Sequence, residues 1–77
     1  MRKMTNVPES GEVLPLSSIY RLIKKAGAID VEQEAIKALR NYLERVGIKI
    51  AERAIELAKH EERKTIKAID IILAITQ

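Results

Sequence analysis

The chain carries three consecutive stretches in which apolar residues recur at helical spacing. The first is short: it begins near Leu14, Pro15 suits its first turn, and Gly27 is a typical stop signal. Its apolar positions are Leu16, Ile19, Tyr20 and Ile23. We expect a helix of about three turns here.

The second stretch is long and uninterrupted. Asp30 and Gln33 stand at the spacing of a capping box, and the periodicity continues from there to His60. Its apolar stripe is wider than a one-sided surface helix needs. The stripe consists of Ala35, Ile36, Leu39, Tyr42, Leu43, Val46, Ile48, Ile50, Ala51, Ala54, Ile55, Leu57 and Ala58. A helix of about 29 residues is ~43 Å long, whereas a globule of this chain length is only ~30 Å across. The helix therefore needs apolar surface from a partner.

The third stretch is short again. Residues 61–64 interrupt the apolar pattern, and Thr65 is a good N-cap for a last helix from Ile66 towards Thr76. The predicted fold is all-α, with a short, a long and a short helix. Residues 1–13 mix turn formers with charges and show no apolar period, so we expect a flexible N-terminal tail followed by one domain at residues 14–77.

Composition narrows the chemistry further. The 77 residues include no Cys and one His, so neither thiol catalysis nor a protein-only zinc site is expected. We expect no enzyme activity, cofactor or metal. Lys and Arg number 14 against 11 Asp and Glu, and the excess lies in residues 14–31 (+2) and 32–60 (+1), which favours a polyanionic partner. No apolar run approaches the ~20 residues of a membrane span, and no secretion signal is present, so we expect a cytoplasmic protein.

Two loop motifs resemble those of archaeal histones. The second loop and the start of the last helix read RKTIKA at residues 63–68, followed by Asp70 and Ile71. The end of the first helix reads IKKAGA at residues 23–28, and Leu14-Pro15 is similar to the family's start. The resemblance runs without a gap from Leu14 to Gln77, about five sixths of the chain.

The resemblance implies a histone fold in which two chains cross their long helices in a handshake dimer. The first loop of one chain then lies beside the second loop of the other, and double-stranded DNA wraps over these paired loops. Arg21 matches an arginine that enters the minor groove, and Lys64 and Thr65 match a pair that contacts phosphate. Lys24 and Lys25 are either further DNA contacts or charges that complement the helix dipole. The expected assembly is a homodimer, a tetramer or larger, associated with the chromosome.

The same resemblance assigns supporting residues. Arg63 and Asp70 match a pair that braces the second loop, where an exposed ion pair serves positioning more than stability. Leu57, His60 and Asp70 match the surface through which two dimers join, with His60 facing Asp70 of the neighbour. For His60 the alternative is a C-terminal helix cap.

Three features depart from the family pattern. Asp30 stands where an arginine often approaches DNA, the basic residues that often close the last helix are missing, and Ile69 and Ile72 occupy positions that usually look acidic. The isoleucines predict an extra contact surface. The departures favour an alternative function, a histone-fold interaction module that heterodimerises with or caps other histones and binds DNA weakly. A third interpretation is a structural helical dimer unrelated to DNA.

Overall fold

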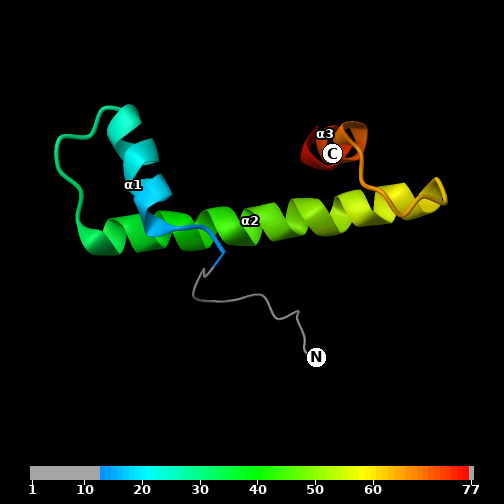
Figure 1. Cartoon of the computed structure of the whole chain (residues 1–77), viewed down its shortest axis with the longest axis horizontal. Helices are drawn as coiled ribbons and strands as arrows, with labels where there is room; N and C mark the ends of the chain where they lie inside the picture. Colours follow the sequence, from blue (N-terminus) through cyan, green and yellow to red (C-terminus); the bar gives the residue numbers. More distant parts are fainter. Residues whose placement is uncertain (1–12, 77) are drawn as a thin grey trace, which may run out of the picture. The chain divides into compact units, whose positions relative to one another are not determined.

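The structure is a computed structural model that describes residues 13–76. It contains three helices, α1 (Leu16–Lys25), α2 (Gln33–His60) and α3 (Ala68–Thr76), and no strand within the described residues (Figure 1). The predicted all-α fold with a short, a long and a short helix is confirmed. Two compact parts share the chain, one reaching to Arg45 and one starting at Val46, and α2 contributes to both.

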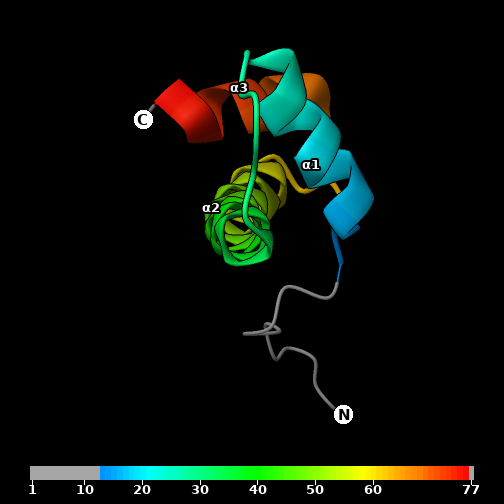
Figure 2. The same cartoon turned by 90° about the vertical axis from the view of Figure 1, so that its left-hand side faces the viewer.

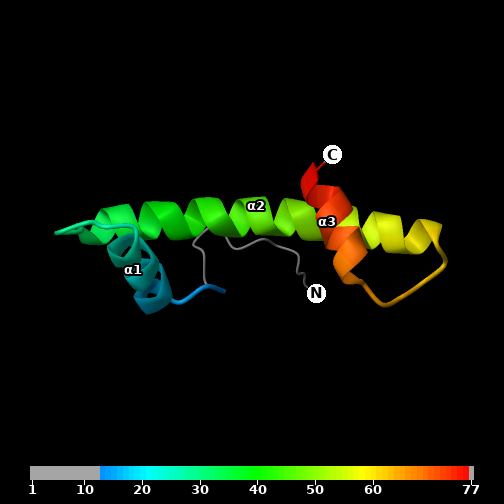
Figure 3. The same cartoon turned by 90° about the horizontal axis from the view of Figure 1, so that it is seen from above.

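In the first part, α1 lies beside the first half of α2 (Figures 1 and 3). Ile19 of α1 and Ile36 of α2 are its buried apolar residues. Glu44 of α2 is also buried, and its Oε2 accepts hydrogen bonds from the backbone N–H groups of Val13, at 2.9 Å, and Leu14. This carboxylate attaches the segment before α1 to α2. Residues 1–12 of the expected tail lie outside the described residues.

Helix α1 ends in a Schellman motif. Gly27 has φ 117°, its N–H donates to Lys24 O at 2.9 Å, and the N–H of Ala28 donates to Ile23 O at 3.4 Å. Glycine suits this position because a left-handed backbone costs it nothing sterically. Gly27 therefore ends the helix as predicted.

The predicted capping box at the start of α2 does not form. Asp30 Oδ1 accepts from the adjacent Val31 N–H at 3.1 Å, and α2 begins only at Gln33, with Glu32 O accepting from Ala35 N–H. Val31 is half-buried and stands five residues before the buried Ile36, the spacing of a hydrophobic staple. This staple spacing fits a helix that begins at Gln33, later than the capping pattern indicated.

In the second part, α3 runs across the second half of α2 (Figures 1 and 3), and Figure 2 shows it beside α2 seen nearly end-on. The buried apolar residues are small: Ala54 and Ala58 of α2 and Ala74 of α3 are 0, 2 and 8 % exposed. Alanines at a helix crossing let the two backbones approach closely. The buried part of this crossing therefore contributes little apolar volume.

Helix α2 ends in the same motif as α1, but with a different residue at its centre. Arg63 N–H donates to Ala58 O at 2.9 Å, and Glu62 N–H donates to Lys59 O at 2.8 Å. Glu62 occupies the left-handed position, with φ 57°. This conformation is sterically unfavourable for a residue with a Cβ.

The predicted start of the last helix was also wrong. Thr65 is not the N-cap of α3, which begins at Ala68, two residues later than expected. Instead, Asp70 in the first turn reaches back and accepts a hydrogen bond from Lys67 N–H at 2.8 Å. A carboxylate three residues into the helix satisfies the N-cap amide in the same way as the acidic half of a capping box.

Much apolar surface stays uncovered in the single chain. No large side chain within residues 13–76 is fully buried. Most of the predicted α2 stripe is only half-buried. The exposed large apolar residues are Val13, Tyr20, Leu22, Ile29, Tyr42, Ile55, Ile66, Ile69, Ile72, Leu73 and Ile75. The apolar core of one chain is therefore incomplete.

Candidate nucleic-acid interface

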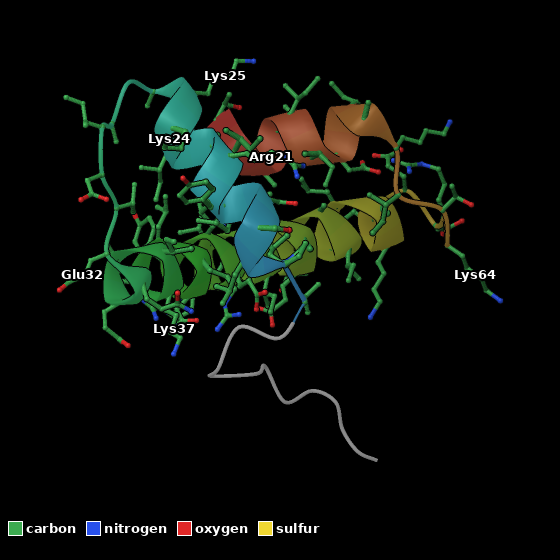
Figure 4. The ribbon with its side chains drawn as sticks, turned by 60° about the vertical axis from the view of Figure 1, so that its left-hand side comes forward. Arg21, Lys24, Lys25, Glu32, Lys37 and Lys64 are labelled. Atoms are coloured by element: carbon green, nitrogen blue, oxygen red, sulfur yellow. The ribbon has the colours of Figure 1, made fainter. Side chains whose placement is uncertain are left out.

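The outward face of α1 is basic. Arg21 and Lys25 lie two and six residues after the buried Ile19, which places both on the opposite side of the helix. Arg21, Lys24 and Lys25 are all exposed, α1 contains no acidic residue, and Figure 4 shows these three side chains extending from the helix. Three positive charges on one helical face form a suitable surface for phosphates.

Lys24 also has a local role. Its Nζ donates to the carbonyl oxygen of Ile29 at 2.8 Å and lies 6.0 Å from the centroid of the Tyr20 ring. The hydrogen bond ties the end of α1 to the loop at residues 26–32, so Lys24 shapes this loop. The two alternatives for Lys24, helix charge or DNA contact, are thus joined by a third role that sequence reasoning missed.

The second loop, residues 61–67, is braced by Arg63. Its Nη1 donates to Thr65 O and to Asp70 Oδ2, and its Nη2 donates to Asp70 Oδ1, each at 2.9 Å. The side chains of Arg63 and Asp70 are 23 and 3 % exposed, so this pair is largely buried, not exposed as expected. Between the braced residues, Lys64 and Thr65 are exposed, and the Lys64 side chain extends from the loop (Figure 4). The brace fixes the backbone that presents them.

Both partners of the brace have shifted acidities. The hydrogen bonds from Arg63, followed by that from the Lys67 amide, lower the pKa of Asp70 to about 2. The same hydrogen bond to Asp70 raises the pKa of Arg63. Both shifts favour the charged forms, so the pair stays ionised at neutral pH and below it.

The residues expected at a dimer–dimer surface are spread over the end of α2 and the start of α3. Leu57 is half-buried and His60, the last residue of α2, is exposed. Asp70 is buried, and both of its carboxylate oxygens are engaged by Arg63. Within one chain, Asp70 thus serves the second loop before any contact with a neighbour.

Two acidic residues, Asp30 and Glu44, also affect how the site is interpreted. Asp30 is exposed in the first loop, beside Ile29, whose side chain is 91 % exposed. Glu44 was not singled out from the sequence, because a glutamate beside an apolar helical stripe is indistinguishable from a solvated one. Within residues 13–76, no group of three potential metal ligands occurs, and no helix is long and apolar enough to cross a membrane.

The short, long and short helices with their two ordered loops define a histone-fold protein. The family model for the histone-like transcription factor (CBF/NF-Y) and archaeal histone matches residues 12–75, and the chain belongs to this family. It is similar to one subunit of the archaeal histone HAN1 of Thermococcus zilligii, with 50 % identity over 80 % of this chain and 92 % of the relative. It is also similar to a probable archaeal histone 3 of Methanocaldococcus jannaschii, with 40 % identity over the same shares of the two chains.

Proposed function

We propose that this chain is a chromatin protein that packages double-stranded DNA as a handshake dimer, with little sequence specificity. The observation that carries the proposal is the basic outward face of α1 in a chain of the archaeal histone family. A surface of lysines and arginines on helices and loops suits phosphate contact and groove insertion, and it reads no base edges. Such a protein acts at the chromosome.

The dimer follows from the incomplete core. α3 is apolar on nearly all sides, and Leu73, which flanks its packed side, remains 38 % exposed. A helix that is apolar all round belongs in an interior. Ile55 and Ile66 border a hollow of about 220 Å³ under the second loop. A second chain crossing α2 supplies the missing apolar surface, so we expect the dimer to be obligate.

Each candidate DNA contact has its own role. Arg21 enters the minor groove, as its family position implies, and Lys25 adds phosphate contact from the same face. Lys64 and Thr65 bind phosphate from the braced second loop, near the N-terminus of α3. Lys24 contributes charge while its hydrogen bond to Ile29 O holds the first loop. Two dimers join through Leu57, His60 and Asp70 to form a tetramer.

Titration of duplex DNA at several salt concentrations, with nuclease protection, tests the proposal. We expect the logarithm of the binding constant to fall with the logarithm of salt at a slope of about −5 to −9, for roughly 6 to 10 neutralised phosphates. Arg21→Ala and Lys64→Ala should each weaken binding on all sequences. Lys37→Ala is the matched control, since Lys37 lies on α2 and pairs with Glu34 at 3.7 Å. A flat salt response would refute DNA packaging.

One observation favours the second candidate, a module that pairs with or caps other histones. Asp30 places an exposed negative charge in the first loop, where it repels phosphate. One of the similar proteins is named as one subunit of a histone, which suits assembly with a different chain. A weak and salt-insensitive DNA response, together with preferential dimerisation with another histone chain, would support this function.

A further inference from the structure

The outward face of α3 carries two isoleucines that remain half-exposed among residues 13–76. Asp70 and Ala74, 2 and 8 % exposed, mark the side of α3 that packs on α2. At about 100° per residue, Ile72 lies opposite the midpoint of that side and Ile69 about 120° from it. Ile69 and Ile72 are 50 and 53 % exposed. A chain that completes the core on the α2 side of α3 therefore leaves this face open.

The same face of α3 carries no charged side chain. Thr76, one turn beyond Ile72, turns its Oγ1 back onto the helix and donates to Ile72 O at 3.0 Å and to Leu73 O at 3.4 Å. Asp70 is the one charged residue of α3, and Arg63 engages both of its oxygens. Ile69, Ile72 and Thr76 thus form an uncharged strip, hereafter the α3 strip. Because the strip contains no cationic side chain and no free hydrogen-bond donor, it is not suited to contact DNA.

We propose that the α3 strip packs against the α3 strip of a second copy of this chain, belonging to a neighbouring dimer. An uncharged apolar strip is complementary to another of the same kind, and one that meets its own copy about a two-fold axis closes into a symmetric contact. A dimer carries the strip twice, so successive contacts link dimers into a larger assembly. The proposal rests on the proposed dimer but not on DNA binding.

The N-terminal segment is a poorer occupant. Residues 1–12 include four charged residues, Arg2, Lys3, Glu9 and Glu12, together with Pro8 and Gly11. Burying such a segment on an uncharged strip would remove charges from water without partners. The strip of a second copy carries no charge and therefore avoids this cost.

Sedimentation equilibrium of the full chain without DNA tests the contact. We expect the double variant Ile69→Glu with Ile72→Glu to remain a helical dimer that still forms the tetramer through Leu57, His60 and Asp70, while association beyond the tetramer weakens at least tenfold. The control is Val13→Glu with Ile29→Glu, which adds the same charge at side chains 70 and 91 % exposed outside the strip. The control should change association by less than twofold. Unchanged association in the strip variant, or equal loss in the control, would overturn the proposal.

A cross-linking experiment separates the contact from any folding defect. The chain has no cysteine, so I72C introduces a single thiol. A short bismaleimide should link two I72C chains faster than two I29C chains, at concentrations where wild-type dimers associate. Equal rates would contradict pairing of like strips. Deleting residues 1–12 should leave association beyond the tetramer intact, and its loss would assign the strip to that segment instead.

DNA titration of the strip variant distinguishes the two proposals. Retained DNA affinity with lost association beyond the tetramer would support both. If the strips still pair in a protein that does not bind DNA, this inference would hold and the packaging function would be refuted.

Discussion

Arg63 donates hydrogen bonds to both carboxylate oxygens of Asp70, with Nη1–Oδ2 and Nη2–Oδ1 distances of 2.9 Å. The backbone N–H of Lys67 is the third donor to this carboxylate, at 2.8 Å. Two fork-like bonds from a guanidinium fix orientation as well as charge. One pair thus joins three elements of the second loop: the end of the α2 motif at Arg63, the carbonyl of Thr65 and the first turn of α3.

This pair predicts acid-sensitive stability. The pKa of Asp70 is lowered from 3.8 to about 2 in the folded chain, so ionised Asp70 stabilises the fold above pH 3.8. That contribution is lost as the pH falls from 3.8 through 2. Asp70→Asn should therefore melt at a lower temperature than wild type at pH 7, and the two melting temperatures should converge near pH 2. Circular dichroism at several pH values measures both.

The exposed Asp30 provides the control for this experiment. Its Oδ1 accepts only a backbone hydrogen bond from Val31, which asparagine retains. Asp30→Asn should follow wild type over the same pH range. A melting difference for Asp70→Asn that stays constant from pH 7 to pH 2 would show that charge on Asp70 is irrelevant.

Glu62 and Gly27 occupy the same position of the same helix-ending motif, which predicts that Glu62→Gly stabilises the protein. The left-handed conformation at Glu62, φ 57°, costs a residue with a Cβ roughly 1 to 2 kcal/mol. Glycine avoids this cost but loses about 0.5 to 1 kcal/mol through its greater freedom in the unfolded chain. We expect a net gain of about 0.5 to 1 kcal/mol in the free energy of unfolding, measured by urea denaturation.

Two substitutions test whether the backbone conformation is the cause. Glu61→Gly, one residue earlier and outside the left-handed region, should destabilise the protein. Gly27→Ala should also destabilise it, because φ 117° strains any residue with a Cβ, although a Cβ there meets no other atom within 4 Å. Stabilisation by both glutamate substitutions would point to lost negative charge instead.

Periodicity predicted the three helices because apolar spacing reflects which faces are buried. α2 ends at His60 as expected, and Gly27 ends α1. The helix starts were predicted less well. Asp30 and Thr65 both have good capping side chains, but α2 begins only after the half-buried Val31, and α3 begins where Asp70 reaches back to Lys67 N–H. Thr65 indicated only a local preference, whereas the start of α3 involves Asp70, whose carboxylate Arg63 holds across the second loop.

The residues of the candidate site were also predicted only in part. The resemblance led to Arg63 and Asp70, and the structure joins them. The hydrogen bond from Lys24 to Ile29 O and the buried carboxylate of Glu44 link residues five and thirty or more positions apart, through backbone groups that carry no sequence signal. Such contacts could not be predicted from residue types alone.

Glu44 gives the next prediction. Its Oε2 satisfies two backbone amides, so Glu44→Ala leaves the amides of Val13 and Leu14 without their acceptor. Leaving buried or half-buried donors unpaired costs about 1 to 3 kcal/mol. We expect that loss in the free energy of unfolding and faster hydrogen exchange of the Leu14 amide.

Glu44→Gln is the matched variant. Its side-chain oxygen remains an acceptor, and its amide group takes the place of Oε1, which has no hydrogen-bond partner in the described part of the chain. Protection of the Leu14 amide should therefore persist. If Glu44→Ala leaves exchange at Leu14 unchanged, the carboxylate does not hold this segment in solution.

The last prediction concerns Asp30, because its charge decides between the two proposed functions. Asp30 is exposed in the first loop, and removing its charge from both chains raises the net charge of a dimer by two units. A unit charge about 7 Å from a phosphate in water contributes about 0.6 kcal/mol. Asp30→Asn should therefore tighten DNA binding about two- to fivefold at low salt, and the gain should shrink as salt rises. Fluorescence anisotropy with labelled duplex DNA measures the effect.

Glu34→Gln controls for net charge. Glu34 lies on α2 with its side chain 76 % exposed and pairs with Lys37, so its neutralisation makes the same formal change outside the first loop. A packaging protein with the first loop on DNA should respond more strongly at Asp30 than at Glu34. Equal responses would mean that the first loop does not approach the phosphates. Asp30 would then be free to serve a protein contact, as the interaction-module function requires.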